Sequence, residues 1–175
     1  GVQKVIKSNS ESAESTLTAG LTAFNTNGYS IGTDGDINNN TSTYVSWNWL
    51  GNGAGVANTD GSINSTVSAN TTSGFSIVKW SNTGSNATIG HGLGVAPSMI
   101  ITKVTNDTYT WYTYHKSLDA TDYVALNSSN ATADNATLWQ DTEPTTSVFS
   151  VGTAFGALDM IAYCFADVQG YSKFG

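Results

Sequence analysis

The chain has 175 residues, of which 39% are hydrophobic and only 11% are charged, and its net charge is −7. Globular proteins average about 25% charged residues, so Ser, Thr, Asn and Gly must supply most of the polar surface here. The sequence holds six lysines and no arginine. The absence of a basic stripe that could neutralise phosphates argues against binding to nucleic acid and to anionic membrane surfaces.

Short runs of alternating apolar and polar residues, separated by Gly, Asn, Asp and Ser clusters, extend along most of the chain and predict half-buried strands. In chain order the predicted strands are Val2–Lys7, Gly28–Gly32, Tyr44–Leu50, Gly74–Trp80, Ser98–Val104, Tyr109–His115, Asp122–Leu126, Ser147–Gly152 and Met160–Val168. Segments 10–21 and 130–140 fit either a short helix or an irregular crossing. The pattern predicts an all-β fold, an antiparallel β-sandwich, with a jelly roll favoured over other sandwich topologies.

The sequence also repeats itself, since segment 5–49 runs parallel to segment 124–165. The clearest matches pair Gly28–Thr33 with Val148–Thr153, Val45–Trp49 with Ile161–Phe165, and Gly170–Gly175 (GYSKFG) with Gly74–Lys79 (GFSIVK). Self-similarity of this kind is typical of arrays and appendages built from one β-rich unit. We therefore expect the chain to be cut from a longer array.

The repeat sets the expected domain boundaries. Residues 1–56 are expected to be the second half of one sandwich repeat, and residues 74–175 a complete repeat plus the first strand of the next. Residues 57–73 are rich in Gly, Asn, Ser and Thr and are interpreted as a linker, with a short strand near 62–67. The first copy is incomplete, so its open sheet edge must be covered by the second unit, another chain or further sequence.

The segment Gly90–Pro97 (GHGLGVAP) is the sharpest local motif. Gly92 and Gly94 permit positive φ, and Pro97 favours an extended residue before the next strand. Leu93 is expected to anchor the loop in the core. His91 is interpreted as a structural histidine that hydrogen-bonds loop backbone, with a ligand or pH-sensitive role as the alternative.

The aromatic strand Tyr109–His115 suggests a second kind of site. One of its faces must join the core, while the other could present aromatic rings on which sugars stack. The candidate glycan-binding residues are Trp111, Tyr112, Tyr114, His115 and, from a separate segment, Trp139. Core packing of the same residues is the competing interpretation.

The remaining motifs give little support for metal binding or catalysis. Asp34–Asn38 opens like a calcium loop but lacks the later Gly and Glu, and an Asx turn explains it without an ion. Calcium therefore stays an open alternative to the expectation of no metal and no cofactor. The carboxylate pairs Asp141 with Glu143 and Asp119 with Asp122 are the only candidates for glycoside hydrolysis. Cys164 lies in an apolar run and is expected to be a core thiol.

Several ordered motifs carry a family resemblance: GFSIV, GHGLGVAPSMIITK, WYTYH, DYVALNSS, SVFSVG and IAYCFADVQGYSKFG, preceded by NGYSIGTDGDINNNTSTYVSWNWLGNGAGVANTDGSI. The series resembles a repeated domain of bacteriophage virion proteins, of the tail-fibre or appendage type of marine phages that infect cyanobacteria and other ocean bacteria. The resemblance implies a concanavalin-like sandwich in a structural or adhesive virion protein, located in the virion and extracellular, with no catalytic residues.

The expected function is therefore that of a non-enzymatic virion structural module, which forms a homo-oligomer through sheet edges and contacts other virion proteins. The alternative is an adhesin that binds host surface glycans.

Overall fold

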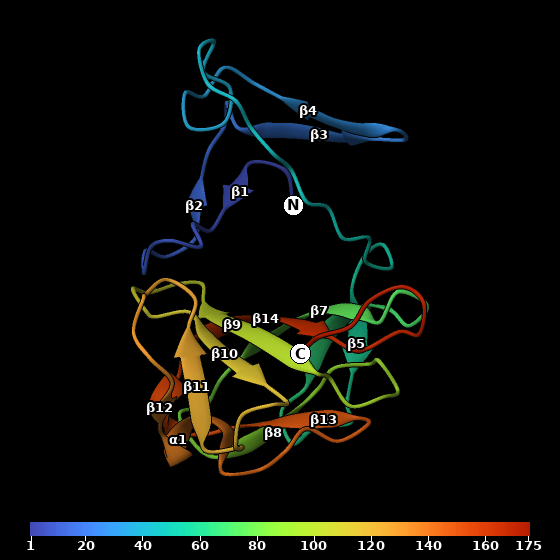
Figure 1. The fold of residues 1–175 in the computed structure, drawn as a ribbon, viewed down its shortest axis with the longest axis vertical. Helices are drawn as coiled ribbons and strands as arrows, with labels where there is room; N and C mark the ends of the chain where they lie inside the picture. The colour runs from blue at the N-terminus through green and yellow to red at the C-terminus, as the bar shows by residue number, and fades with distance from the viewer.

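A computed structural model describes all of residues 1–175, and its regular secondary structure consists almost entirely of short strands (Figure 1). The elements are β1 (Lys4–Val5), β2 (Ser15–Thr16), β3 (Leu21–Asn25), β4 (Gly28–Ile31), β5 (Val56–Asn58), β6 (Ser65–Asn70), β7 (Phe75–Ser81), β8 (Ala87–Gly90), β9 (Met99–Val104), β10 (Tyr112–His115), β11 (Asp122–Ala125), β12 (Ala133–Asp134), α1 (Ala136–Trp139), β13 (Val148–Val151), the 3₁₀ helix η1 (Thr153–Phe155) and β14 (Asp159–Phe165). The predicted all-β fold class is confirmed. No helix is long and apolar enough to cross a membrane.

One large antiparallel sheet forms the main layer. Its eight strands lie in the order β12-β11-β10-β9-β14-β7-β6-β5. The longest strands occupy the middle, where β14 pairs with β7 on one side and with β9 on the other, so that Phe165 lies between Phe75 and Met99. A strand with two partners has all its backbone groups satisfied within the sheet, which suits the apolar sequence of β14.

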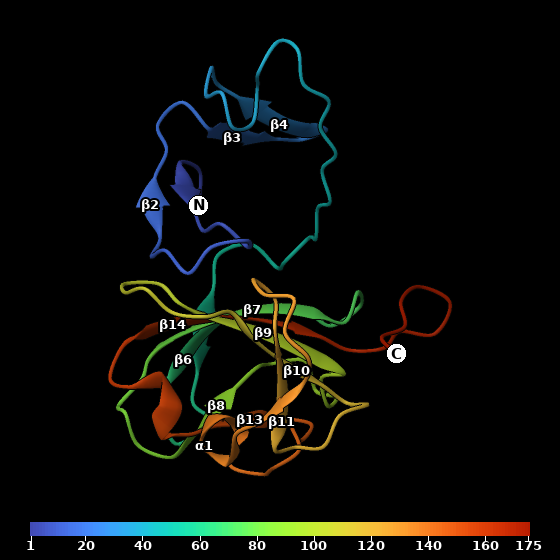
Figure 2. The ribbon, with the colours of Figure 1, turned by 60° about the vertical axis from the view of Figure 1, so that its left-hand side comes forward.

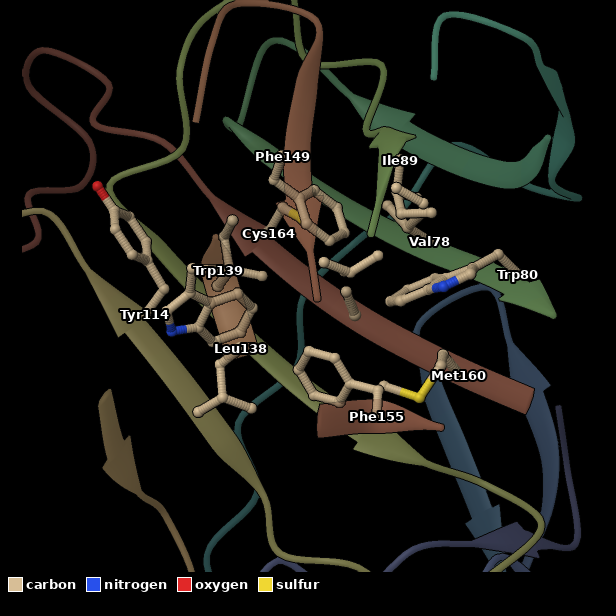
Figure 3. Packing of buried hydrophobic residues seen from close by; sticks show 14 of the residues in the cluster. Val78, Trp80, Ile89, Tyr114, Leu138, Trp139, Phe149, Phe155, Met160 and Cys164 are labelled. Carbon is tan, nitrogen blue, oxygen red and sulfur yellow. The ribbon is translucent and has the colours of Figure 1, made fainter. Parts of the chain in front are cut away.

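The second layer packs across the core from this sheet and contains β8, β13, α1 and η1 (Figure 3). Alternate residues of the central strands point into the space between the layers, among them Val78 and Trp80 of β7 and Met160 of β14. Phe149 of β13 meets Trp80 edge-to-face at 5.6 Å. Burying each large apolar side chain contributes about 1.5–3 kcal/mol, so this interlayer cluster stabilises the sandwich.

The amino-terminal region lies outside the sandwich (Figures 1 and 2). It holds two isolated strand pairs, β1 with β2 and the hairpin β3 with β4. Of the 36 buried residues in the chain, only Gly20 precedes Ser65. This region therefore has no hydrophobic core of its own.

The structure corrects two sequence-based predictions about this part of the chain. Tyr44–Leu50 forms no strand, and each of its residues is exposed. The interpretation of residues 57–73 as a linker is wrong, because β6 pairs along β7 and β5 pairs along β6. Val67 supplies the reason, since its side chain fills the core beside the edge of β7.

Candidate assembly surface

Several backbone pairings of residues 3–32 recur in residues 121–152. The β1–β2 register, Lys4 with Thr16, has the same spacing as the β11–β12 register, Asp122 with Asp134. The shared hydrogen bonds are Leu17 N to Gln3 O and Asn135 N to Thr121 O, both 2.8 Å, and Gly32 N to Gly20 O and Gly152 N to Leu138 O, both 2.8 Å. The offset between the copies is 118 residues from Gln3 to Gly20, one less than the sequence match of Val5 with Val124 indicates, and 120 residues at Gly32.

The copies diverge where their final strands begin. In the complete copy, Ile161–Phe165 belongs to β14 at the centre of the large sheet. The matching residues Val45–Trp49 have no strand partner, and Figure 2 shows this part of the chain running from the level of the β3–β4 hairpin towards the large sheet. The side chains of Val45, Trp47 and Leu50 are 71%, 74% and 78% exposed. The same sequence pattern thus gives a buried strand in one copy and an exposed apolar segment in the other.

An apolar groove lies between this segment and the β3–β4 hairpin. It encloses about 470 Å³ and is lined by Leu21, Phe24, Tyr29, Ile31, Ile37, Asn38, Tyr44, Val45, Ser46 and Asn48. Like the equivalent β13, which pairs only with β8, β4 has a single strand partner, β3, so that its other edge is unpaired. We call the groove, Tyr44–Leu50 and this edge of β4 together the assembly surface.

Residues Lys7–Glu14 hold the amino-terminal region on the outer face of the large sheet. The indole Nε1 of Trp111 donates to the carbonyls of Lys7 and Ser10, each at 3.1 Å. The ammonium of Lys103 donates to the carbonyl of Glu11 at 3.0 Å, and Glu14 N donates to Thr105 O at 2.8 Å. These contacts are made by backbone atoms of the amino-terminal segment, so they depend little on its side chains.

The predicted glycan-binding residues do not form an exposed platform. Trp111, Tyr114 and Trp139 are buried. Tyr112 packs edge-to-face on Tyr123 and Phe155 inside the sandwich. His115, like Tyr112, is partly open to solvent, and its Nδ1 accepts a hydrogen bond from Ser117 N.

The two faces of the aromatic strand explain this outcome. Tyr112 and Tyr114 point into the core, where Tyr114 meets Trp139 edge-to-face at 6.2 Å. On the opposite face, Trp111 stacks on Tyr163 and is covered by Lys7–Ser10. The hydroxyl of Tyr114 donates to the Glu143 carboxylate, and burial together with this bond raises the pKa of the phenol. The prediction of a stacking surface is therefore wrong, because Tyr112, Tyr114 and Trp139 pack in the core and the amino-terminal segment covers Trp111.

The Gly90–Pro97 loop is ordered around His91, which is fully buried. The imidazole Nδ1 accepts from Leu93 N at 3.2 Å, and Nε2 lies 3.2 Å from the Thr145 carbonyl. Gly92 and Gly94 have φ of 70° and 75°, Leu93 lies in the core, and Pro97 is buried before β9. Burial lowers the pKa of His91, although the Thr145 carbonyl and Asp60 oppose this. The neutral imidazole of His91 thus holds the Gly90–Pro97 loop in place.

The acidic motifs behave as turns and surface groups. Asp36 N donates to Asp34 Oδ1 at 2.9 Å, which is the predicted Asx turn, and Lys7 pairs with Asp36 at 2.9 Å. No group of three or more His, Cys, Asp or Glu residues is placed to hold a metal ion.

Comparison with protein families then places the chain. A family model described as "Domain of unknown function (DUF7483)" matches residues 1–175. The chain belongs to this family. No curated protein and no solved structure matches it. The DUF7483 match covers the amino-terminal half and the sandwich alike, so the assembly surface lies within the family's own unit.

Sequence analysis of this DUF7483 chain missed Lys103. Its side chain is fully buried, and its ammonium is held by backbone carbonyls, at 3.0 Å from Glu11 O and 2.8 Å from Val104 O. Burial lowers the pKa of this lysine, while Glu11 and Asp107 oppose the shift. The available signal was a single charged residue inside the apolar run MIITKV. Charged residues are rarely buried without a partner, so this lysine indicates a hydrogen-bonding partner nearby. Lys103 and Trp111 together form the docking point for the amino-terminal segment.

Proposed function

We propose that this chain is a non-enzymatic structural module of a virion fibre or appendage, which assembles with further copies through its strand edges. The observation that supports this most strongly is the pair of equivalent segments, Val45–Trp49 and β14. The first is exposed and has no strand partner, its only ring contacts being those of Trp49 with Phe75 and Phe165, and the second is a central strand of the large sheet.

The exposed segment has an energetic reason to find a partner. Tyr44, Val45, Trp47, Trp49 and Leu50 are all more than half exposed and lie next to one another in the chain. Contiguous apolar surface of this kind marks interaction sites in soluble proteins. Burying each such side chain stabilises a complex by about 1.5–3 kcal/mol before the costs of association.

The backbone of the same region offers unpaired hydrogen-bonding groups in addition to the apolar surface. The free edge of β4 and the segment Tyr44–Leu50 both carry N–H and C=O groups that no strand satisfies. An exposed edge of this type accepts a strand from another chain, and main-chain hydrogen bonds then supply the affinity. The virion setting and the contacts with other virion proteins rest on the resemblance of the sequence motifs.

The test is the assembly state of the whole chain, measured by light scattering coupled to size exclusion and by electron microscopy. The expected result is a species several times larger than the 18.3 kDa chain. The double variant Val45→Asp, Trp47→Asp should shift this species towards monomer. A matched control is Val95→Asp, which places a charge at an exposed apolar residue of the sandwich, 49% exposed, and should leave assembly unchanged. A parent chain that stays monomeric at all concentrations would contradict the proposal.

A further inference from the structure

We infer that the strand which completes the assembly surface is Gly170–Gly175 of a second copy, added alongside Val45–Trp49. The inference rests on the proposed function and names the donor segment, the register and the direction of assembly.

The register comes from the complete unit. There β7 and β14 run antiparallel, with Phe75 opposite Phe165, Ile77 opposite Tyr163 and Val78 opposite Ala162. Gly170–Gly175 matches the start of β7, and Val45–Trp49 matches the end of β14. Transferring the pairing places Tyr171 opposite Trp49, Lys173 opposite Trp47, and Phe174 opposite Ser46.

The side chains fit this register. Val78 and Ala162 face the core of the sandwich, so their equivalents Phe174 and Ser46 should face the groove. Ser46 lines the apolar groove of about 470 Å³, next to Tyr44 and on the same side as Asn48. Phe174 would place an aromatic ring beside the small Ser46, and a buried Phe removes 150–250 Å² from water. Ser172 would lie opposite Asn48, so the two polar side chains could hydrogen-bond, as the register pairs Ser76 with Cys164.

Within a single copy the donor segment is held elsewhere. Val168 and Ser172 form an antiparallel bridge around Gly170, whose φ is 77°. Phe174 N donates to Asp167 Oδ1 at 2.9 Å, and the Phe174 ring packs on Phe165 at 5.4 Å, outside the groove. A change of backbone conformation at Gly170 would free the strand for a neighbouring copy, because glycine adopts many conformations without strain.

This exchange has a fixed polarity. The donated strand and the accepting surface are different parts of the chain, so one-way addition is a heterologous contact that builds a ring or an open filament. Reciprocal exchange between two copies would instead close a two-fold dimer.

The test uses two single-cysteine additions to the full chain, Trp47→Cys and Lys173→Cys, mixed in equal amounts and oxidised. Both side chains are exposed, so neither change should prevent folding. Opposite residues of antiparallel strands have Cα atoms about 4.5–5.5 Å apart, which is within disulfide range. The expected result is a disulfide-linked two-chain product, in which peptide mapping finds positions 47 and 173 joined. This product should be at least about tenfold more abundant than any disulfide-linked dimer of the parent chain, which keeps Cys164.

The matched control is Ser172→Cys mixed with Trp47→Cys. Successive side chains of a strand point to opposite faces, so this pair should link at background level. Two results would reject the strand addition: equal linking of both cysteine pairs, or no linking of either pair although the parent chain oligomerises. Both results would leave the proposed function standing. A monomeric parent chain would reject both.

Discussion

The amino-terminal half and the sandwich contain equivalent segments with opposite surroundings. β4 and β13 have matching sequences, and so do Tyr44–Leu50 and β14. In the sandwich both strands pack against a second layer, and in the amino-terminal half neither does. The difference teaches that the apolar alternation of these segments suits a sheet but does not form one alone, because a strand is stabilised by cross-strand and cross-layer contacts.

The largest expected contrast comes from the equivalent aromatic residues Phe149 and Tyr29. Phe149 is 1% exposed and Tyr29 is 41% exposed. Phe149→Ala should lower the free energy of unfolding by about 3–5 kcal/mol, because it leaves a cavity in the core. Tyr29→Ala should change it by about 0.5 kcal/mol or less. Urea unfolding followed by circular dichroism measures both, and similar losses would show that the β3–β4 hairpin shares the core of the sandwich.

A second contrast uses the equivalent glycines Gly152 and Gly32. A Cβ at Gly152 would lie 2.0 Å from the Thr137 carbonyl oxygen, and one at Gly32 would lie 2.4 Å from that of Ala19. Gly152→Ala should destabilise the sandwich by about 1–3 kcal/mol through overpacking. Gly32→Ala should leave the main unfolding transition in place and speed amide hydrogen exchange only within residues 19–34. A lower transition midpoint for Gly32→Ala would be evidence against separate stability of the two regions.

A smaller effect is expected at the contact between the regions. Trp111→Phe removes the indole N–H that binds the carbonyls of Lys7 and Ser10, at a cost of about 1 kcal/mol. Residues 7–14 should then exchange amide hydrogens faster and be cleaved more readily by proteases. Trp139→Phe is the control, because the Trp139 N–H has no partner and lies in the core. Equal release of residues 7–14 in both variants would mean that Trp111 does not hold the segment.

The smallest effect concerns pH and involves the sandwich alone. Burial lowers the pKa of His91 in the folded state below its ordinary value near 6.5. At a pH between the pKa of His91 in the folded chain and its higher pKa in the unfolded chain, the unfolded chain binds more protons than the folded chain. The free energy of unfolding should therefore fall as the pH drops from 7.5 to 5. The variant His91→Gln should lose part of this slope in urea unfolding at several pH values. An identical slope in the variant would remove His91 as its source.

The strands that sequence could predict are the longest ones, rich in apolar residues, even where their partners lie far away in the chain. β7, β9 and β14 are six or seven residues long, β14 pairs with both of the others, and the sequence predicts each of them close to its observed bounds. β6 has the composition of a linker and becomes a strand because the edge of β7 is available. Tyr44–Leu50 is the reverse case, a strand-like sequence without a neighbouring strand.

The candidate site was only partly predictable for the same reason. Open edges in the incomplete copy follow from the repeat, so the position of the assembly surface could be expected. The burial of Trp111 could not, because its cover comes from Lys7 and Ser10, about a hundred residues earlier. Such backbone contacts leave no side-chain signature in a single sequence.

Cys164 has a practical consequence for experiments on this chain. Its side chain is fully enclosed at the centre of the sandwich, and burial raises the pKa of the thiol to about 12. Thiolates, and not thiols, attack maleimides and other alkylating reagents, so the native residue should stay unmodified at neutral pH. Fluorescent dyes or spin labels can therefore be attached through one added surface cysteine without first replacing the natural one.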